Sequence, residues 1–279
     1  MLLENSDVAS SSCCSRATSS IIATTRDPAK LADLAARGVD VRAADFNDEA
    51  SLTKAFAGAD RALLVSTDAL DQREAQQLRA VKALEAAGVK HVVYTSVPNP
   101  ETTLAIVGPS HAVTEKALAA SKLDYTVLRN NLYADLLFAS LPGAIKSGQL
   151  VDAKPTGKVA WITREDCART AAGALVSATG RSAVAVTGPE AIDSDTLAAI
   201  AAEVTGKPVV HVAVPADVLI AGMVEHGLPK LVAELFASFD AAAEKGQLAD
   251  VTDTVAKYAG RPPQSVTSFL SDARAVLLG

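Results

Sequence analysis

The fold class of this chain is decided by EAAGVKHVVYTS at residues 85–96, HAVTEKALAAS at 111–121 and LDYTVLRNNLY at 123–133. In order, these segments predict a helix that ends at Gly88, a buried strand from His91 to Ser96, a second helix, and a second buried strand from Tyr125 to Arg129. Together they form a βαβ unit. Polar residues stand where both strands end, and open α/β sheets place their ligands at such ends.

Strand and helix patterns alternate from Ile21 onward, which is typical of a parallel, doubly wound sheet. Further strands are expected at residues 21–25, 39–44, 61–66, 183–187 and 209–214. Further helices are expected at 30–37, 48–57, 71–87 and 193–204, and most of the chain after Pro215 is expected to be helical. Asp48 and Thr163 suit helix N-caps, and Gly206 suits a helix end.

We therefore predict an α/β fold, a Rossmann-like doubly wound parallel sheet with a smaller, mostly helical C-terminal substrate lobe. The sheet domain is expected to comprise residues 1–141 and 161–214. The lobe is expected to comprise residues 142–160 and 215–279.

Composition excludes several classes of protein. The 279 residues are 49% hydrophobic and 21% charged, which is enough to bury a large core. A net charge of -6 without a basic run argues against a nucleic-acid partner. No apolar stretch approaches the length of a membrane span and no secretory signal is evident, so we expect a cytoplasmic protein. Three cysteines and four scattered histidines predict neither a disulfide framework nor a metal site.

Three motifs, AAGVKHVVYTS, HxxTEKxL at 111–118 and YTxLRNxxY at 125–133, are similar to those of atypical short-chain dehydrogenases of the NmrA-like group. Within that group the chain resembles the branch of type 2 NAD(P)H:quinone oxidoreductases and triphenylmethane reductases, from Ile21 to the C-terminus. The resemblance implies hydride transfer from NADPH, or from NADH, to a quinone or similar conjugated aromatic acceptor. We expect a monomer or homodimer, and the sequence does not decide between them. The alternative is a non-catalytic, NAD(P)-sensing regulatory protein of the NmrA type.

The N-terminus departs from this family pattern. Family members open with a strand and a glycine-rich turn, GATGxLG, whereas this chain opens MLLENSDVASSSCCSRATSS and has no glycine before Gly38. A side chain at such a turn blocks the close backbone approach and the positive φ that phosphate binding uses. Two interpretations stay open: an N-terminus altered on an otherwise intact member, or a natural, divergent, serine-rich one. A reductase disabled by loss of the glycine-rich loop is a further alternative.

The resemblance also implies which residues bind the cofactor and the acceptor. Arg26 is expected to face the adenosine 2'-phosphate, since a planar guanidinium suits that group, and this favours NADPH over NADH. Asp27 directly precedes Pro28 and is better suited to capping a helix. The other expected cofactor contacts are Asp45, Phe46, Ser66, Thr67, Thr95, Ser96, Glu115 and Asn130. The expected acceptor contacts are Asn131, Tyr133, Phe138 and Trp161, with core packing as the alternative for Trp161.

Ordinary short-chain dehydrogenases carry a Tyr-x-x-x-Lys pair on the helix after the buried strand, and His111 and Glu115 stand at the corresponding positions. One helical turn separates them, so they share a face of the helix. His111, with an ordinary pKa of about 6.5, is the candidate catalytic proton donor, and the alternative is a structural histidine. Glu115 cannot replace the positive charge of lysine, which disfavours alcohol–ketone chemistry. Hydride transfer to an electron-poor acceptor needs less help from a proton donor.

Overall fold

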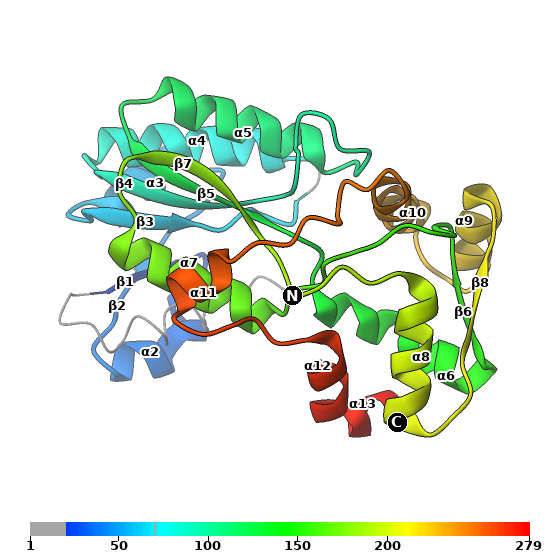
Figure 1. Ribbon diagram of the computed structural model, residues 1–279. Coiled ribbons are helices and arrows are strands. Elements are labelled where there is room, and N and C mark those ends of the chain that lie inside the picture. Colours follow the sequence, from blue (N-terminus) through cyan, green and yellow to red (C-terminus); the bar gives the residue numbers. More distant parts are fainter. Residues whose placement is uncertain (1–20, 70) are drawn as a thin grey trace. The chain divides into compact units, whose positions relative to one another are not determined.

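The computed structural model describes residues 21–69 and 71–279 (Figure 1). This part of the chain forms two compact units. Unit one comprises the described residues up to Ser96, together with Ser110–Leu128 and Cys167–Val184. Unit two comprises Val97–Pro109, Arg129–Asp166 and Ala185–Gly279. The sequence-based division places residues 97–109, 129–141, 161–166 and 185–214 of unit two in the sheet domain, and as a division into functional domains it stays a prediction.

The strands of the described residues form three sheets. Unit one contains β1 (Ile22–Thr25) paired with β2 (Asp40–Ala43), and a sheet in the order β3-β4-β5-β7 whose last two strands continue into unit two. The bounds of that sheet are β3 Arg61–Leu64, β4 His91–Ser96, β5 Asp124–Asn130 and β7 Arg181–Val186. Unit two contains the pair β6 (Gln149–Asp152) and β8 (Val210–Ala213). The pairs β1–β2, β3–β4 and β6–β8 are parallel, as expected.

The helices follow the expected alternation. The first part of the chain forms η1 (Pro28–Leu31), α2 (Ala32–Ala36), α3 (Glu49–Phe56), α4 (Arg73–Ala86), α5 (Gly108–Ala120), η2 (Ala134–Ala139) and α6 (Leu141–Ser147). The second part forms α7 (Arg164–Ser177), α8 (Ser194–Thr205), α9 (Ala216–Glu225), α10 (Lys230–Glu244), α11 (Thr254–Ala259), α12 (Val266–Asp272) and α13 (Arg274–Leu278).

The predicted helix ends are confirmed. The Asp48 carboxylate accepts hydrogen bonds from two backbone N–H groups of α3, and the Thr163 hydroxyl accepts one from Asp166 N at 3.0 Å. Gly206 ends α8 with a φ of 73°, a left-handed conformation that glycine adopts without a steric penalty.

Strand β4 lies inside unit one. Val92 and Val93 point to opposite faces of the sheet and are both fully buried, so both faces are covered. Figure 1 shows α4 and α5 over one face and α7 over the other. The core of unit one includes Leu52, Leu64, Leu84, Val92, Leu118 and Val127. This packing makes the carboxyl end of β4 the point at which polar side chains emerge.

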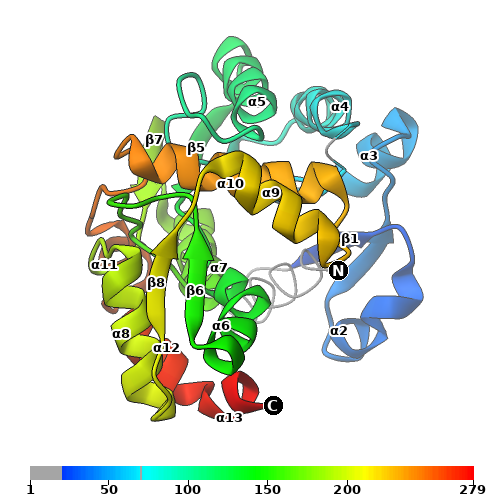
Figure 2. The same ribbon diagram turned by 90° about the vertical axis from the view of Figure 1, so that its right-hand side faces the viewer.

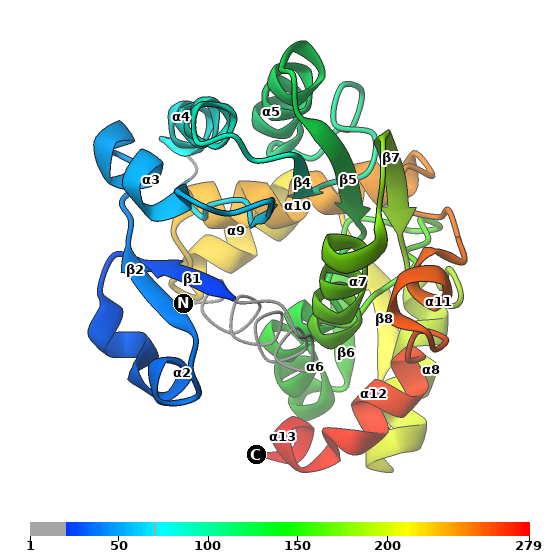
Figure 3. The same ribbon diagram turned by 90° about the vertical axis from the view of Figure 1, so that its left-hand side faces the viewer.

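Unit one does not form one continuous sheet within the described residues. There, β1 pairs only with β2 and β3 only with β4, and Figure 3 shows β1 and β2 side by side. In a doubly wound sheet the first strand lies between the strands that correspond to β1 and β3. The departure from the family pattern at this strand and at the phosphate turn falls on residues 1–20, which lie outside the described residues.

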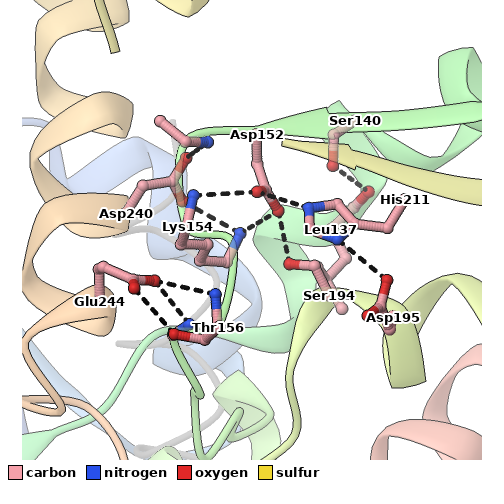
Figure 4. A network of polar contacts seen from close by, with 12 residues as sticks. Leu137, Ser140, Asp152, Lys154, Thr156, Ser194, Asp195, His211, Asp240 and Glu244 are labelled. Atoms are coloured by element: carbon pink, nitrogen blue, oxygen red, sulfur yellow. Dashed lines mark hydrogen bonds and ion pairs between the residues drawn. The ribbon is translucent and has the colours of Figure 1, made fainter. Parts of the chain in front are cut away.

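Unit two is built around the β6–β8 pair, with α6 beside β6 and α8 beside β8 (Figure 2). Its apolar core includes Leu137, Leu141, Trp161, Leu197 and Leu270. A buried group of charges lies at the end of the strand pair (Figure 4). There, Lys154 Nζ lies 2.5 Å from Asp152 Oδ2 and 3.1 Å from Asp240 Oδ1. One buried cation therefore joins β6 to α10.

Asp152 also accepts hydrogen bonds from Ser194 Oγ at 2.5 Å and lies 2.9 Å from His211 Nε2 (Figure 4). Burial opposes ionisation of this carboxyl, but the Lys154 charge and the hydrogen bonds outweigh burial and hold the pKa of Asp152 below its usual value. Serine, histidine and aspartate are the residues of a hydrolase triad. Here the carboxylate stands between the hydroxyl and the ring, so Ser194 has no base, and the group is structural.

The charge of Lys154 should matter far more for stability than that of an exposed lysine. We expect Lys154→Met to lower the free energy of unfolding by about 3–5 kcal/mol at pH 7, because two buried carboxylates lose their counter-ion. The matched control is Lys90→Met, whose pair with Asp60 is exposed, and it should change little. Urea unfolding checks this. Equal effects of the two substitutions would contradict the structural role given to Lys154.

Candidate functional site

The structure brings together four of the predicted cofactor residues at the carboxyl ends of β3 and β4. Ser66 N donates to Thr95 Oγ1 at 2.9 Å, which ties the end of β3 to the end of β4. Ser96 Oγ donates to Glu115 Oε1 at 2.7 Å, which ties β4 to α5. The strand ends therefore carry hydroxyl groups whose orientation is set by their neighbours.

Thr67 directly follows Ser66, and one of its polar atoms makes no hydrogen bond with the described residues. Its carbonyl accepts a hydrogen bond from Arg73 Nε at 2.6 Å, and Arg73 is itself buried. Its hydroxyl oxygen, Oγ1, is also buried but has no hydrogen-bond partner in the described part of the chain. Buried hydroxyls almost always have a partner, so Thr67 Oγ1 is an atom that a ligand would satisfy.

Directly below, a chain of hydrogen bonds links β4 to α4 and α5. Thr114 Oγ1 lies 3.0 Å from Ser110 O, and since a carbonyl only accepts, the Thr114 hydroxyl donates. Gln77 Nε2 therefore donates to Thr114 at 3.1 Å, which leaves Gln77 Oε1 to accept from Tyr94 at 3.0 Å. Tyr94 has then used its only proton. The remaining contact, 2.8 Å between Tyr94 Oη and His111 Nδ1, must be donated by the ring.

This chain of bonds fixes the tautomer of His111 with its proton on Nδ1. Burial, with a contribution from the positive charge of Arg73, lowers the pKa of His111 to about 3. This pKa lies well below the unperturbed histidine value of about 6.5. At pH 7 the ring is neutral, and its one proton is held by Tyr94. His111 as a catalytic residue stays a prediction, and its contacts favour a role in positioning α5 on β4.

The adenosine-side residues lie on separate turns. Arg26 is exposed at the end of β1, and its side chain makes no hydrogen bond or ion pair with the described residues. Asp27 caps η1 by accepting from Ala29 N at 3.1 Å, as expected. Asp45 Oδ1 accepts from Asn47 N at 2.8 Å, and Phe46 packs against the core of unit one. Of these polar side chains, Arg26 alone has no polar partner within the described residues, and its contact with a phosphate stays a prediction.

In unit two, the end of β5 carries a second unsatisfied atom. Asn130 Nδ2 lies 3.4 Å from Tyr133 Oη, whereas Asn130 Oδ1 is buried without a hydrogen-bond partner in the described chain. The Arg164 guanidinium lies over the Tyr133 ring, 4.3 Å from its centroid. Sequence analysis missed Arg164, although its position in WITRED, next to a helix cap, was a usable signal.

The other residues predicted to contact the acceptor make hydrogen bonds or packing contacts within unit two. Asn131 Nδ2 donates to Leu248 O at 2.9 Å, and Asn131 Oδ1 accepts from Leu132 N at 2.8 Å. Trp161 is 8% exposed and belongs to the core of unit two, which supports the packing alternative. Phe138 is partly buried beside this core. Acceptor binding by these residues stays a prediction.

Other kinds of site find no support in the described residues. They contain no group of three or more side chains of the metal-binding types. In the same part of the chain, no helix is long and apolar enough to cross a membrane.

Parallel sheets, covering helices and polar strand ends define an α/β protein of the Rossmann-like class. The sequence profile of the NmrA-like family matches residues 11–269, and the chain belongs to this family. It is 37% identical to quinone oxidoreductase 2 of Escherichia coli over 254 residues, which cover 91% of this chain and 89% of that protein. It is 30% identical to an NAD(P)H azoreductase of Xenophilus azovorans, over 88% of this chain and 86% of that protein.

Solved structures agree. The fold is similar to that of the Escherichia coli NADPH-dependent quinone oxidoreductase complexed with NADPH, with a TM-score of 0.91, 33% identity and coverage of 98% of this chain and 96% of that one. It is also similar to Citrobacter triphenylmethane reductase complexed with NADP(H), with a TM-score of 0.89, 31% identity and 95% coverage of each chain. The expected family and fold class are confirmed.

The pKa of His111 predicts a dependence of stability on pH. Because the folded-state pKa of about 3 lies below the unfolded value of 6.5, the unfolded chain binds a proton that the folded chain refuses. Stability is therefore lost as the pH falls from 6.5 toward 3, by up to about 1.4 kcal/mol per pH unit. His111→Gln should lose stability less steeply across this window in urea unfolding. Parallel curves for the two proteins would show that the ring accepts a proton in the folded state.

Proposed function

We propose that this chain is an NAD(P)H-dependent reductase that transfers hydride to a quinone or a similar conjugated aromatic acceptor. The observation that carries the proposal is the buried hydroxyl of Thr67, whose Oγ1 has no hydrogen-bond partner in the described chain. Thr67 follows β3, and sheets of this class bind a dinucleotide at such strand ends. In unit two, Asn130 Oδ1 at the end of β5 also lacks a partner among the described residues. The relatives named as quinone and azo reductases give the proposal its reaction type.

The residues present fit a dinucleotide. Arg26 would bind the 2'-phosphate, and Asp45 and Phe46 would lie against the adenosine. Thr67 would hydrogen-bond the ribose or nicotinamide end, and Asn130 the carboxamide. The remaining contacts at the strand ends would come from Ser66, Thr95, Ser96 and Glu115. The pyrophosphate turn falls on residues 1–20, outside the described chain.

When bound, NADPH would supply the hydride. The protein would hold the hydride donor and the acceptor close together and correctly oriented. It would also avoid placing an additional charged side chain beneath them. The bond from Ser96 holds Glu115 toward β4, and a neutral His111 adds no charge beneath the strand ends. Since the His111 proton is held by Tyr94, the proton that completes the reduced acceptor is expected to come from water.

Fewer observations support the acceptor contacts than the cofactor contacts. Tyr133 and Phe138 are its expected aromatic walls, and Asn131 and Trp161 are expected to support them from the core. A monomer or homodimer in the cytoplasm is part of the same proposal and rests on the sequence pattern alone. An NAD(P)-sensing protein would bind the dinucleotide equally but would not oxidise it.

Thr67→Val tests the cofactor site without disturbing the fold. The substitution replaces an unsatisfied hydroxyl by a methyl group, so the free energy of unfolding should stay equal or rise. NADPH affinity, measured by fluorescence titration, should fall about 5- to 20-fold because a hydrogen bond to the ligand is lost. Thr53→Val on the exposed face of α3 is the control. Unchanged NADPH affinity would place Thr67 outside the site.

Arg26→Ala tests the choice of cofactor. NADPH affinity should fall about tenfold, whereas NADH affinity should not change, because only NADPH carries the 2'-phosphate. Arg26→Lys should keep part of the preference through its charge. The prediction fails if Arg26→Ala leaves the affinity for NADPH as it was.

A further inference from the structure

Arg164 differs from Arg261 and Arg274 of unit two in the partners of its guanidinium group. Arg261 Nη2 pairs with Asp166 Oδ1 at 2.8 Å, and Arg274 Nε donates to Val204 O at 2.8 Å. The Arg164 guanidinium donates to no described residue, and its Nε is buried without an acceptor. An unsatisfied buried donor is costly, which points to a partner that is not part of the described chain.

The Asp135 carboxylate, which bonds to the backbone of Arg164, does not pair with its guanidinium. Asp135 Oδ2 accepts from the backbone N of Arg164 at 3.0 Å, and it forms no ion pair with the guanidinium. A guanidinium is charged at all working pH values and has five N–H donors. The position therefore presents a permanent positive charge with unused donors.

The orientation of the guanidinium is set by Tyr133. Its carbon lies 4.3 Å from the centroid of the ring, so one face of the group rests on the aromatic surface. Stacking of this kind leaves the in-plane N–H groups available, and these match two oxygens of a sulfonate or carboxylate. Asn130, whose Oδ1 is unsatisfied, contacts the Tyr133 hydroxyl, so the same tyrosine connects Arg164 to the end of β5.

We propose that Arg164 is a specificity-determining residue that binds an anionic oxygen group, a sulfonate or a carboxylate, on a flat aromatic acceptor. This inference rests on the proposed reductase function. The net charge of the chain is -6, so an anionic acceptor meets a repulsive mean field and needs a local unpaired cation. Arg164 supplies that cation next to an aromatic ring on which the acceptor can pack.

The test compares two acceptors of the same shape and different charge. The anionic acceptor is anthraquinone-2-sulfonate, and the neutral one is 2-(hydroxymethyl)anthraquinone, which is substituted at the same ring position. Dissociation constants are measured by quenching of Trp161, the single tryptophan, with and without NADP+. NADPH oxidation with each acceptor is measured separately. The variants are Arg164→Met, Arg164→Lys and, as a control, Arg274→Met.

We expect Arg164→Met to weaken binding of the sulfonate about 10- to 100-fold and to leave the neutral quinone within about threefold. Arg164→Lys, which keeps the charge but not the planar fork, should fall between, so the test survives if the methionine variant does not fold. Arg274→Met should change neither acceptor. Added salt should weaken sulfonate binding to the wild-type protein and not to Arg164→Met.

Several results would overturn the proposal. If Arg164→Met treats the two quinones alike, or if the wild-type protein does not bind the sulfonate, the guanidinium is satisfied by water only. Loss of NADPH affinity with unchanged discrimination would assign Arg164 to a cofactor phosphate instead. If sulfonate binding depends on Arg164 but NADPH is not oxidised, the anion site is supported and the reductase function is contradicted. If both quinones are reduced and substitution of Arg164 has no effect, the reductase function is supported and the anion site is contradicted.

Discussion

The buried hydroxyl of Tyr94 is the constraint on which the candidate site of unit one depends. A phenol inside an apolar core must be hydrogen-bonded, and this one is bonded to Gln77 of α4 and His111 of α5. The same requirement fixes the direction of each bond and the tautomer of the histidine. Two helices are thereby held against β4, directly beneath the strand ends that carry Thr95 and Ser96. His111, which the resemblance sets at the position of a catalytic tyrosine, is bonded to Tyr94, and its catalytic role stays a prediction.

Much of the fold could be predicted from local sequence. The bounds of β4 and the caps at Asp48, Thr163 and Gly206 follow from apolar runs and capping chemistry, which act within a few residues. The bonds of Tyr94 could not be predicted, because they join residues 17 positions apart whose pairing depends on packing. The lowered pKa of His111 could not be predicted for the same reason, since burial is a property of the assembled unit.

The carboxylate partners of a cation distinguish a structural from a functional role for Lys154 and Arg164 in unit two. Lys154 is buried between two carboxylates, so its charge is neutralised and serves the fold. Arg164 is half-buried and no described carboxylate pairs with it. Sequence alone cannot tell these two cations apart, because the partners of Lys154 include Asp240, 86 residues away along the chain. The position of a cation relative to carboxylates, and not its presence, decides its role.

Whether the folded chain is a working reductase despite its unusual N-terminus can be measured by following NADPH absorbance after a quinone is added to the purified full-length protein. Circular dichroism shows that the protein is folded. We expect saturable NADPH oxidation that requires both the protein and the quinone. Folded protein that binds NADPH but leaves it unoxidised with any quinone would contradict the reductase function and favour a dinucleotide sensor.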